Sequence, residues 1–211
     1  MEQVNVTYYG HACFMLECNG YRVALDPYAN GAVPGLGDLH MEAEAVYCSH
    51  GHGDHNYAEA VTLQKADKPG PYRLEELVVP HDDVGGAKRG MNTVRIFHFG
   101  ALRVAHMGDI GRELTGEEIE RLIHVDCLLL PIGGFFTVDA MQAKTIVEQI
   151  KPKVTVPMHY RMENVGYPVI GTLETFTEQF SNVNYGECSL TLTADTPEGI
   201  YVLTPKMKIG E

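Results

Sequence analysis

The segment Ser49–Asn56, which reads SHGHGDHN, constrains this chain more than any other part of its sequence. It places three of the ten histidines and one aspartate within eight residues. In an extended backbone, side chains two residues apart point to the same side, so His50 and His52 can converge on one point. Asp54 and His55 can then face a second point close by.

These residue types indicate a metal site rather than a solvated polar loop. Imidazole and carboxylate groups together suit Zn²⁺, Mn²⁺ or Fe better than Ca²⁺ or a metal that requires thiolate ligands. Gly51 and Gly53 separate the histidines, and we expect them to allow a tight backbone approach and unusual dihedral angles in this loop.

Further metal ligands must come from distant parts of the chain. Three apolar runs end in candidates: VVPHDD in His81, AHMGDIG in His106 and Asp109, and VPMHY in His159. The ends of buried strands are where a rigid scaffold presents functional side chains. His98, inside NTVRIFHF, also competes for a ligand position, and we interpret it as an ordinary strand histidine.

The pattern of apolar residues predicts an α/β chain. Short segments rich in β-branched and aromatic residues predict strands before residue 110. After residue 110, strands such as CLLLP alternate with helices predicted over 115–125, 138–150 and 172–180. Because no linker divides the sequence, we predict one domain over residues 1–211 with mixed sheets.

Composition limits the partners and the location. A formal net charge of −12, with no cluster of Lys and Arg, disfavours nucleic acid and anionic membranes, but not a small anionic substrate in a metal pocket. No apolar run approaches the ~18 residues needed to cross a membrane, and we expect no signal peptide. The five cysteines are scattered without a CxxC pair, which favours reduced thiols in a cytoplasmic protein. No oligomeric state is predicted.

The chain resembles the metallo-β-lactamase fold superfamily in HGHGDH, the aspartate in ALDPY, a later GD and a later strand-terminal histidine. It is similar to the small stand-alone bacterial Zn-dependent hydrolase branch, akin to the ascorbate-6-phosphate lactonase-like proteins, in YYGHACF, HDDVGGAKRGMNT, AHMGDIG, PIGGFFTVDA and VPMHY. The resemblance implies a four-layer αβ/βα sandwich with two mixed β-sheets and a dinuclear metal site at one edge of the sheets.

The resemblance also implies roles for individual residues. The first metal would be held by His50, His52 and His81, and the second by Asp54, His55 and His159. Asp109 would bridge the two metals. Asp26 would brace the histidine loop from beneath. The HDDVGG context favours His81 over His98 and His106, and His106 would orient a ligand by a hydrogen bond. His11 would line the pocket, orient a ligand or be a structural histidine.

From such a dinuclear metal site we predict a hydrolase. Two divalent ions can share a hydroxide and make it a nucleophile at neutral pH. We assign two Zn²⁺ ions, with Mn²⁺ or Fe as alternatives. With the carboxylates of Asp54 and Asp109 as catalytic groups, the site keeps a residual positive charge, which favours a small anionic substrate. We therefore expect cleavage of an ester-like bond in a lactone, phosphoester or phosphodiester.

Two other functions remain open on the same ligands. One is an iron-dependent redox enzyme, although the chain has no room for a flavin domain, and the other is a non-catalytic metal-binding or regulatory protein. We expect substrate specificity to lie in loops 28–40 and 63–90. Gly133 and Gly134 would let the backbone pass close to the site, and Phe135 and Phe136 would either wall the site or pack in the core.

Overall fold

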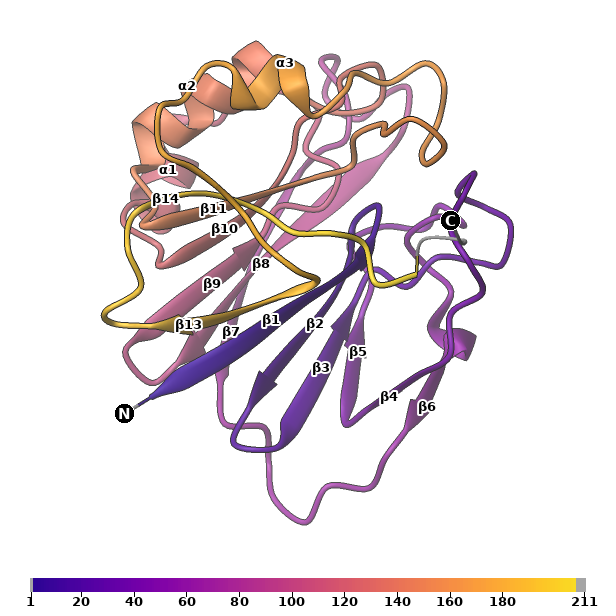
Figure 1. The fold of residues 1–211 in the computed structure, drawn as a ribbon, viewed down its shortest axis with the longest axis vertical. Helices are drawn as coiled ribbons and strands as arrows, with labels where there is room; N and C mark the ends of the chain where they lie inside the picture. The colour runs from indigo at the N-terminus through magenta and orange to yellow at the C-terminus, as the bar shows by residue number, and fades with distance from the viewer. Residues whose placement is uncertain (1, 208–211) are drawn as a thin grey trace.

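The computed structural model describes residues 2–207, in which two β-sheets pack face to face and helices cover one of them (Figure 1). The smaller sheet has five strands in the order β13-β1-β2-β3-β5. It is mixed, because β5 runs parallel to β3 and the other pairs are antiparallel. The strands are β1 (Gln3–Gly10), β2 (Cys13–Cys18), β3 (Tyr21–Leu25), β5 (Ala45–Tyr47) and β13 (Ser189–Thr193).

The larger sheet has seven strands in the order β12-β14-β11-β10-β9-β8-β7. Its pairs are parallel from β12 to β9 and antiparallel from β9 to β7. The strands are β7 (Arg73–Pro80), β8 (Met91–Phe99), β9 (Leu102–His106), β10 (Cys127–Pro131), β11 (Val154–Met158), β12 (Val183–Tyr185) and β14 (Gly199–Val202). The α/β class with two mixed sheets is therefore confirmed.

The helices follow the start signals in the sequence. They are α1 (Gly116–Leu122), α2 (Ala140–Ile150) and α3 (Glu174–Thr177). Thr115 and Asp139 begin α1 and α2 with complete capping boxes. α3 is shorter than the predicted 172–180, and Leu173 at its start provides no side-chain cap. None of the helices within residues 2–207 is long and apolar enough to cross a membrane.

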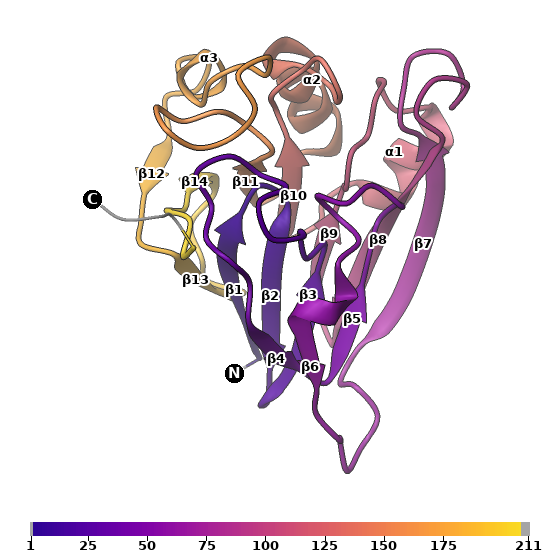
Figure 2. The same cartoon turned by 90° about the vertical axis from the view of Figure 1, so that its right-hand side faces the viewer.

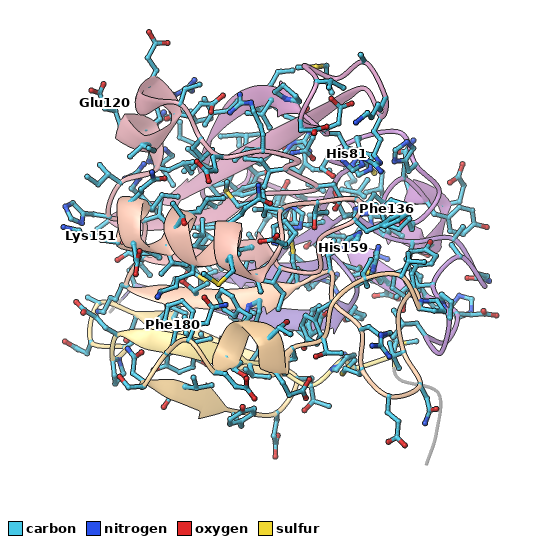
Figure 3. All side chains as sticks on the ribbon, turned by 90° about the horizontal axis from the view of Figure 1, so that it is seen from above. His81, Glu120, Phe136, Lys151, His159 and Phe180 are labelled. Atoms are coloured by element: carbon cyan, nitrogen blue, oxygen red, sulfur yellow. The ribbon has the colours of Figure 1, made fainter. Side chains whose placement is uncertain are left out.

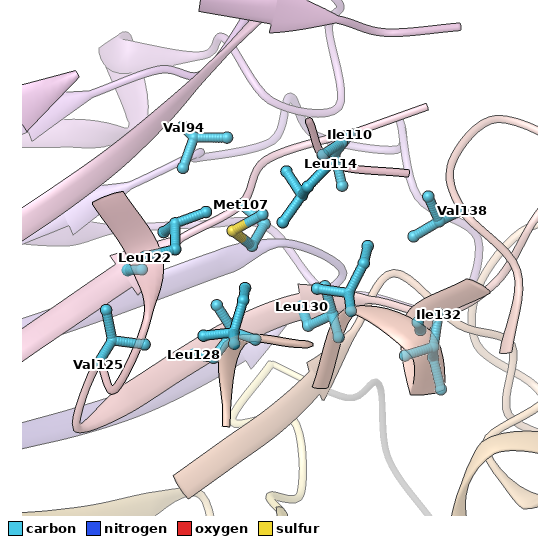
Figure 4. Close-up of a cluster of buried hydrophobic side chains, with 14 of the residues drawn as sticks. Val94, Met107, Ile110, Leu114, Leu122, Val125, Leu128, Leu130, Ile132 and Val138 are labelled. Carbon is cyan, nitrogen blue, oxygen red and sulfur yellow. The ribbon is translucent and has the colours of Figure 1, made fainter. Parts of the chain in front are cut away.

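Hydrophobic side chains fill both faces of the larger sheet. Strand β10 explains why CLLLP is apolar throughout. Leu128 and Leu130 belong with Ile146 of α2 to the core beneath the helices. Figure 4 shows Leu128 and Leu130 in this cluster. Cys127 and Leu129 belong to the core between the two sheets. A strand covered on both faces needs apolar residues at every position.

The outer face of the smaller sheet carries a layer built mainly of loop. Met15 and Ala24 pack there against Tyr28, Leu36 and Leu39 of the segment that follows β3. Figure 2 views the molecule from this side, where the two-stranded sheet of β4 and β6 completes the layer. These strands are β4 (Met41–Ala43) and β6 (Val61–Leu63), and β6 follows the short 3₁₀ helix η1 (Ala58–Ala60).

The apolar segment 43–49, AEAVYCS, reads as one buried strand in the sequence, but the structure divides it between two strands. β4 ends at Ala43 and pairs with β6, whereas β5 begins at Ala45 and pairs with β3. Glu44 separates them because it is bound to Arg22: its amide donates to the Arg22 carbonyl (2.9 Å), and its carboxylate accepts from the Arg22 amide (2.6 Å). The residues of β5 are half-buried.

Candidate metal centre

Histidines from two parts of the chain form the first candidate ligand group. His50 and His52 follow β5, and His81 directly follows β7. One ring nitrogen of each lies within 4.8 Å of the others. His52 is exposed and His81 is buried, so the group runs from the surface into the molecule. These are the three residues that the sequence suggests for the first metal.

A second group lies beside the first and contains four residues. Asp54, His55 and His159 come together with His11, and their ligand atoms again lie within 4.8 Å of one another. His159 follows β11, and His11 lies in the turn between β1 and β2. His11 Nε2 is 3.2 Å from Asp54 Oδ2. His11 is thus placed among the candidate ligands, as a partner of Asp54 or as a ligand itself.

Asp109, which follows β9, lies between the two groups. Its Oδ2 atom is 3.2 Å from His159 Nε2 and 3.3 Å from His55 Nε2 in the second group. The same atom is 3.5 Å from His81 Nε2 and 4.0 Å from His50 Nε2 in the first group. One carboxylate therefore faces histidines of both groups. Figure 3 shows His81 and His159 at the same end of the sheets.

Asp26, directly after β3, orients histidines of both groups. Its Oδ2 atom accepts a hydrogen bond from His55 Nδ1 (2.8 Å) and another from Ser49 Oγ (2.5 Å). Ser49 Oγ in turn lies 2.9 Å from His50 Nδ1. Because both rings bond through Nδ1, the Nε2 atoms of His50 and His55 are left to face Asp109. Asp26 therefore acts as a buried hydrogen-bond acceptor that orients these side chains.

The donor atoms themselves test whether a metal fits. Within residues 2–207, several buried atoms of these groups have no hydrogen-bond partner, namely His50 Nε2, His55 Nε2, His81 Nδ1, His159 Nδ1 and Nε2, and Asp109 Oδ1. A buried polar atom without a partner is unfavourable by about 1–3 kcal/mol. A bound cation would provide a partner for one nitrogen of each ring and for the Asp109 carboxylate, and nitrogen and oxygen donors suit Zn²⁺, Mn²⁺ or Fe.

The charges in the cluster also favour a cation. Burial lowers the pKa of His50 to about 3 and that of His11 to about 4, so both rings are neutral at pH 7. Burial alone would also lower the pKa of His55, but Asp109 and Asp26 raise it well above its usual value. Without metal, His55 is therefore protonated on both ring nitrogens, and its positive charge offsets part of the negative charge of Asp109 and Asp26. Metal binding would displace one of these protons.

Two residues that the sequence analysis did not identify fix the backbone of Asp109. Asn92, buried at the start of β8, accepts from the Asp109 amide (2.9 Å) and donates to the Met107 carbonyl (2.8 Å). Gly108 adopts φ +52, and a Cβ atom there would lie 2.6 Å from Ser49 Cβ. In the sequence, Asn92 could have been singled out as a polar residue at the first inward-facing position of an otherwise apolar strand.

His106 does not bond a candidate ligand side chain. Its Nε2 atom donates to the Ala12 carbonyl (2.9 Å), and its Nδ1 atom accepts from the Gly108 amide (3.3 Å). It therefore connects the backbones beside His11 and Asp109. His98 lies elsewhere, 3.3 Å from Glu75 on the neighbouring strand.

Strained backbone occurs at the site, but not at the predicted glycines. His11, Asp26 and His159 have φ between 44° and 56°, which is rare for residues other than glycine. The expectation for Gly51 and Gly53 is wrong: φ is not positive at either, and a Cβ atom would meet open space. The loop is exposed at both positions, so no tight approach is needed there.

A cavity of about 390 Å³ opens onto both ligand groups, a volume that suits a small ligand. It is lined by His52, Asp54, His81, Arg89, Asp109, Phe136 and Tyr167. Arg89 belongs to the second loop predicted to set specificity. Tyr167 comes from outside both predicted loops. Its hydroxyl lies 2.8 Å from the Ala32 carbonyl and 3.2 Å from Asp54 Oδ2, and its single proton is donated to one of these acceptors at a time.

The PIGGFF segment contributes one wall of this cavity. Phe136 lines it and lies beside His159, as Figure 3 shows. Phe135 instead points outward and is 64% exposed, so it neither walls the cavity nor packs in the core. Gly133 lies where a Cβ atom would collide with the His159 carbonyl. The absence of a side chain at Gly133 therefore allows the chain after β10 to pass close to the backbone of His159.

Comparisons with known proteins place the chain among related sequences and folds. Residues 5–159 match the Beta-lactamase superfamily domain. A UPF0173 metal-dependent hydrolase of Caldivirga maquilingensis is 30% identical over 183 residues, which cover 72% of this chain and 79% of the relative. A structure from Thermotoga maritima, of the metallo-beta-lactamase superfamily, is 25% identical with a TM-score of 0.74, covering 95% of this chain and 98% of that one. The metallo hydrolase Igni18 of Ignicoccus hospitalis shares the fold, with a TM-score of 0.64 at 21% identity and coverage of 90% and 99%.

Proposed function

This chain belongs to the beta-lactamase superfamily, and we propose that it is a metal-dependent hydrolase that cleaves an ester-like bond in a small lactone, phosphoester or phosphodiester. The observation that carries the proposal is the position of Asp109 between two groups of buried histidine nitrogens without partners. Relatives such as the Caldivirga maquilingensis protein are named metal-dependent hydrolases, which supports the same reaction type.

The proposed centre contains two divalent ions, with Zn²⁺ preferred to Mn²⁺ or Fe for these donors. The first ion would be held by His50, His52 and His81, and the second by Asp54, His55 and His159. The carboxylate of Asp109 would be shared between them. When bound, such ions polarise the scissile carbonyl or phosphoryl group and make water nucleophilic at neutral pH.

The protein's own residues would prepare this reaction. Asp54 and Asp109 supply the carboxylate charge at the reacting position, and two ions would leave the site positive overall. A small anionic substrate is therefore favoured, whereas nucleic acid and anionic membranes are not favoured by the net charge of −12. Phe136 and Tyr167 line the cavity beside these carboxylates.

Metal content and turnover of purified variants test the proposal. Wild-type protein should contain two metal ions per chain by mass spectrometry and should hydrolyse members of a lactone and phosphoester panel. His52→Ala and His159→Ala each remove a ligand of one ion, so each should lose about one ion per chain and nearly all turnover. His98→Ala is the matched control, because it removes a histidine outside the site and should change neither.

Three results would contradict the proposal. Full hydrolytic activity in metal-free His52→Ala protein would exclude a metal mechanism. Bound iron with oxygen-dependent turnover and no hydrolysis would favour a redox enzyme. A full complement of metal with no turnover across the panel would favour a non-catalytic metal-binding protein.

A further inference from the structure

Arg89 differs from the other arginines of this acidic chain. The sequence has 28 acidic and 16 basic residues, so carboxylate partners are abundant. Within residues 2–207, every other arginine side chain contacts a carboxylate or a backbone carbonyl: Arg22, Arg73, Arg95, Arg103, Arg112, Arg121 and Arg161. In the same part of the chain, the Arg89 guanidinium has neither kind of partner. Its hydrogen-bonding edge is therefore free.

The loop that carries Arg89 is organised around one carboxylate. Asp82, next to the candidate ligand His81, accepts four backbone hydrogen bonds, among them that of the Arg89 amide (2.8 Å). Asp82 is 1% exposed, so water does not compete strongly for these bonds. The position of Arg89 is thus fixed relative to His81, and the side chain is half-buried rather than extended into solvent.

The guanidinium packs on an aromatic ring at the wall of the metal cavity. Its central carbon lies 5.5 Å from the centre of the Phe136 ring, within the range of a cation–π contact. The Phe136 ring centre lies 6.5 Å from that of His159 and 5.8 Å from that of Tyr167. Stacking on a ring face leaves the planar edge of an arginine available for hydrogen bonds. Arg89 is itself one of the residues that line the cavity, together with the candidate metal ligands His52, Asp54, His81 and Asp109.

We propose that Arg89 binds an anionic group of the substrate, a carboxylate or a phosphate, that is separate from the bond being cleaved. This inference rests on the proposed function. A guanidinium near two divalent ions experiences repulsion unless an anion lies close to it. An oxyanion in that place would accept two parallel hydrogen bonds from Arg89. The substrate class is then a small ester or lactone that carries its own oxyanion, of a size that a cavity of about 390 Å³ accommodates.

Binding of analogues that cannot react tests Arg89 separately from catalysis. The probes are three cyclic ethers that replace a lactone ring, one neutral, one with a carboxylate arm and one with a phosphate arm. Calorimetry on the metal-loaded protein measures their dissociation constants. Arg89→Ala should weaken binding of one or both anionic ethers about 10- to 100-fold and leave the neutral ether unchanged. The two anionic probes distinguish a carboxylate from a phosphate substrate.

Three further variants distinguish the effect of the charge of Arg89 from effects of its geometry, its packing and the net charge of the protein. Arg89→Lys retains the charge without the two-pronged geometry, so it should recover only part of the affinity. Arg89→Gln retains most of the stem that packs on Phe136, and it should behave like Arg89→Ala if the charge is what matters. Arg73→Ala, at the far end of β7, makes the same change in net charge and should have no effect. Metal content and thermal unfolding are measured for each variant.

The outcomes separate this inference from the proposed function. Equal affinity of wild-type and Arg89→Ala protein for all three ethers, at unchanged metal content, would overturn the role of Arg89 even if lactones are hydrolysed. Loss of anion binding in Arg89→Ala, with no hydrolysis of any lactone or phosphoester by wild-type protein, would support the anion site and reject the hydrolase. With active protein, the corresponding anionic lactone should show a raised KM in Arg89→Ala and little change in kcat.

Discussion

His55 Nδ1 lies 2.8 Å from Asp26 Oδ2, and this buried contact connects the two halves of the candidate metal centre. The same oxygen also accepts from Ser49 Oγ, which contacts His50 Nδ1. One carboxylate oxygen therefore sets the orientation of a histidine in each ligand group. Both Nε2 atoms point at Asp109 as a consequence.

Replacing Asp26 should weaken binding of both metals. Asp26→Asn keeps the size of the side chain, and asparagine tolerates the positive φ of this position better than most residues. The amide cannot accept from Ser49 and His55 as the carboxylate does, so we expect metal affinity to fall about 10- to 100-fold. Competition with a chromophoric chelator measures this. Asp67→Asn, in an exposed loop, is the control, and equal affinities of the two variants would contradict the role of Asp26.

The loop of Arg89 should depend on Asp82 and on pH. Burial alone would raise the pKa of Asp82, but backbone amides, with that of Arg89 as the strongest influence, lower it below its usual value. The stabilisation is therefore present above about pH 4 and is lost as pH falls through the lowered pKa. Amide hydrogen exchange, corrected for intrinsic rates, should show Lys88 and Arg89 losing protection in acid.

Two neighbouring carboxylates provide the comparison for that experiment. Asp82→Asn removes part of the acceptor set, so the loop amides should exchange faster at neutral pH and show less additional loss in acid. Asp83→Asn should leave the exchange unchanged, because Asp83 is exposed and bonds the side chain of Lys88. Equal protection in both variants would mean that Asp82 does not organise the loop.

Glycine substitutions should have opposite outcomes at two positions. Gly108→Ala places a Cβ atom against Ser49 and Asn92 in a backbone region unfavourable for alanine, so it should lower the free energy of unfolding by roughly 2 kcal/mol or more. Gly51→Ala meets open space without positive φ, and should change it by less than about 0.5 kcal/mol. Urea denaturation measures both, and a large loss in Gly51→Ala would contradict the observed loop geometry.

The Tyr167 hydroxyl should matter more for turnover than for metal content. Tyr167→Phe removes the hydroxyl that lies within hydrogen-bonding distance of Asp54 and of the Ala32 carbonyl, while keeping the ring against the cavity. We expect a loss of about 1 kcal/mol in unfolding free energy and a several-fold fall in kcat/KM, with metal stoichiometry unchanged. Tyr185→Phe, at an exposed position, serves as the control. Loss of a metal ion in Tyr167→Phe would instead make its hydroxyl part of the ligand support.

The family and the α/β class could be predicted from local patterns, and both are confirmed. Alternation of two residues marks strands, a capping box marks α1, and apolar residues at helical spacing mark α2. The HGHGDH motif places four candidate ligands within six residues. The positions of His81, Asp109 and His159 at strand ends could also be predicted, because a polar residue after an apolar run is a local feature of the sequence.

The sequence by itself thus determined most of the elements, the resemblance to the family and the residues able to bind a metal. Only the tertiary structure decided how these residues meet. Asp109 faces both ligand groups because β9 and β11 lie in one sheet and end at the same edge, on either side of β10. Asp26, Asn92 and Arg89 gain their roles from contacts with distant segments. Hydrogen bonding and stacking depend on distances between atoms, and sheet order, which sets those distances, is not encoded in any local pattern.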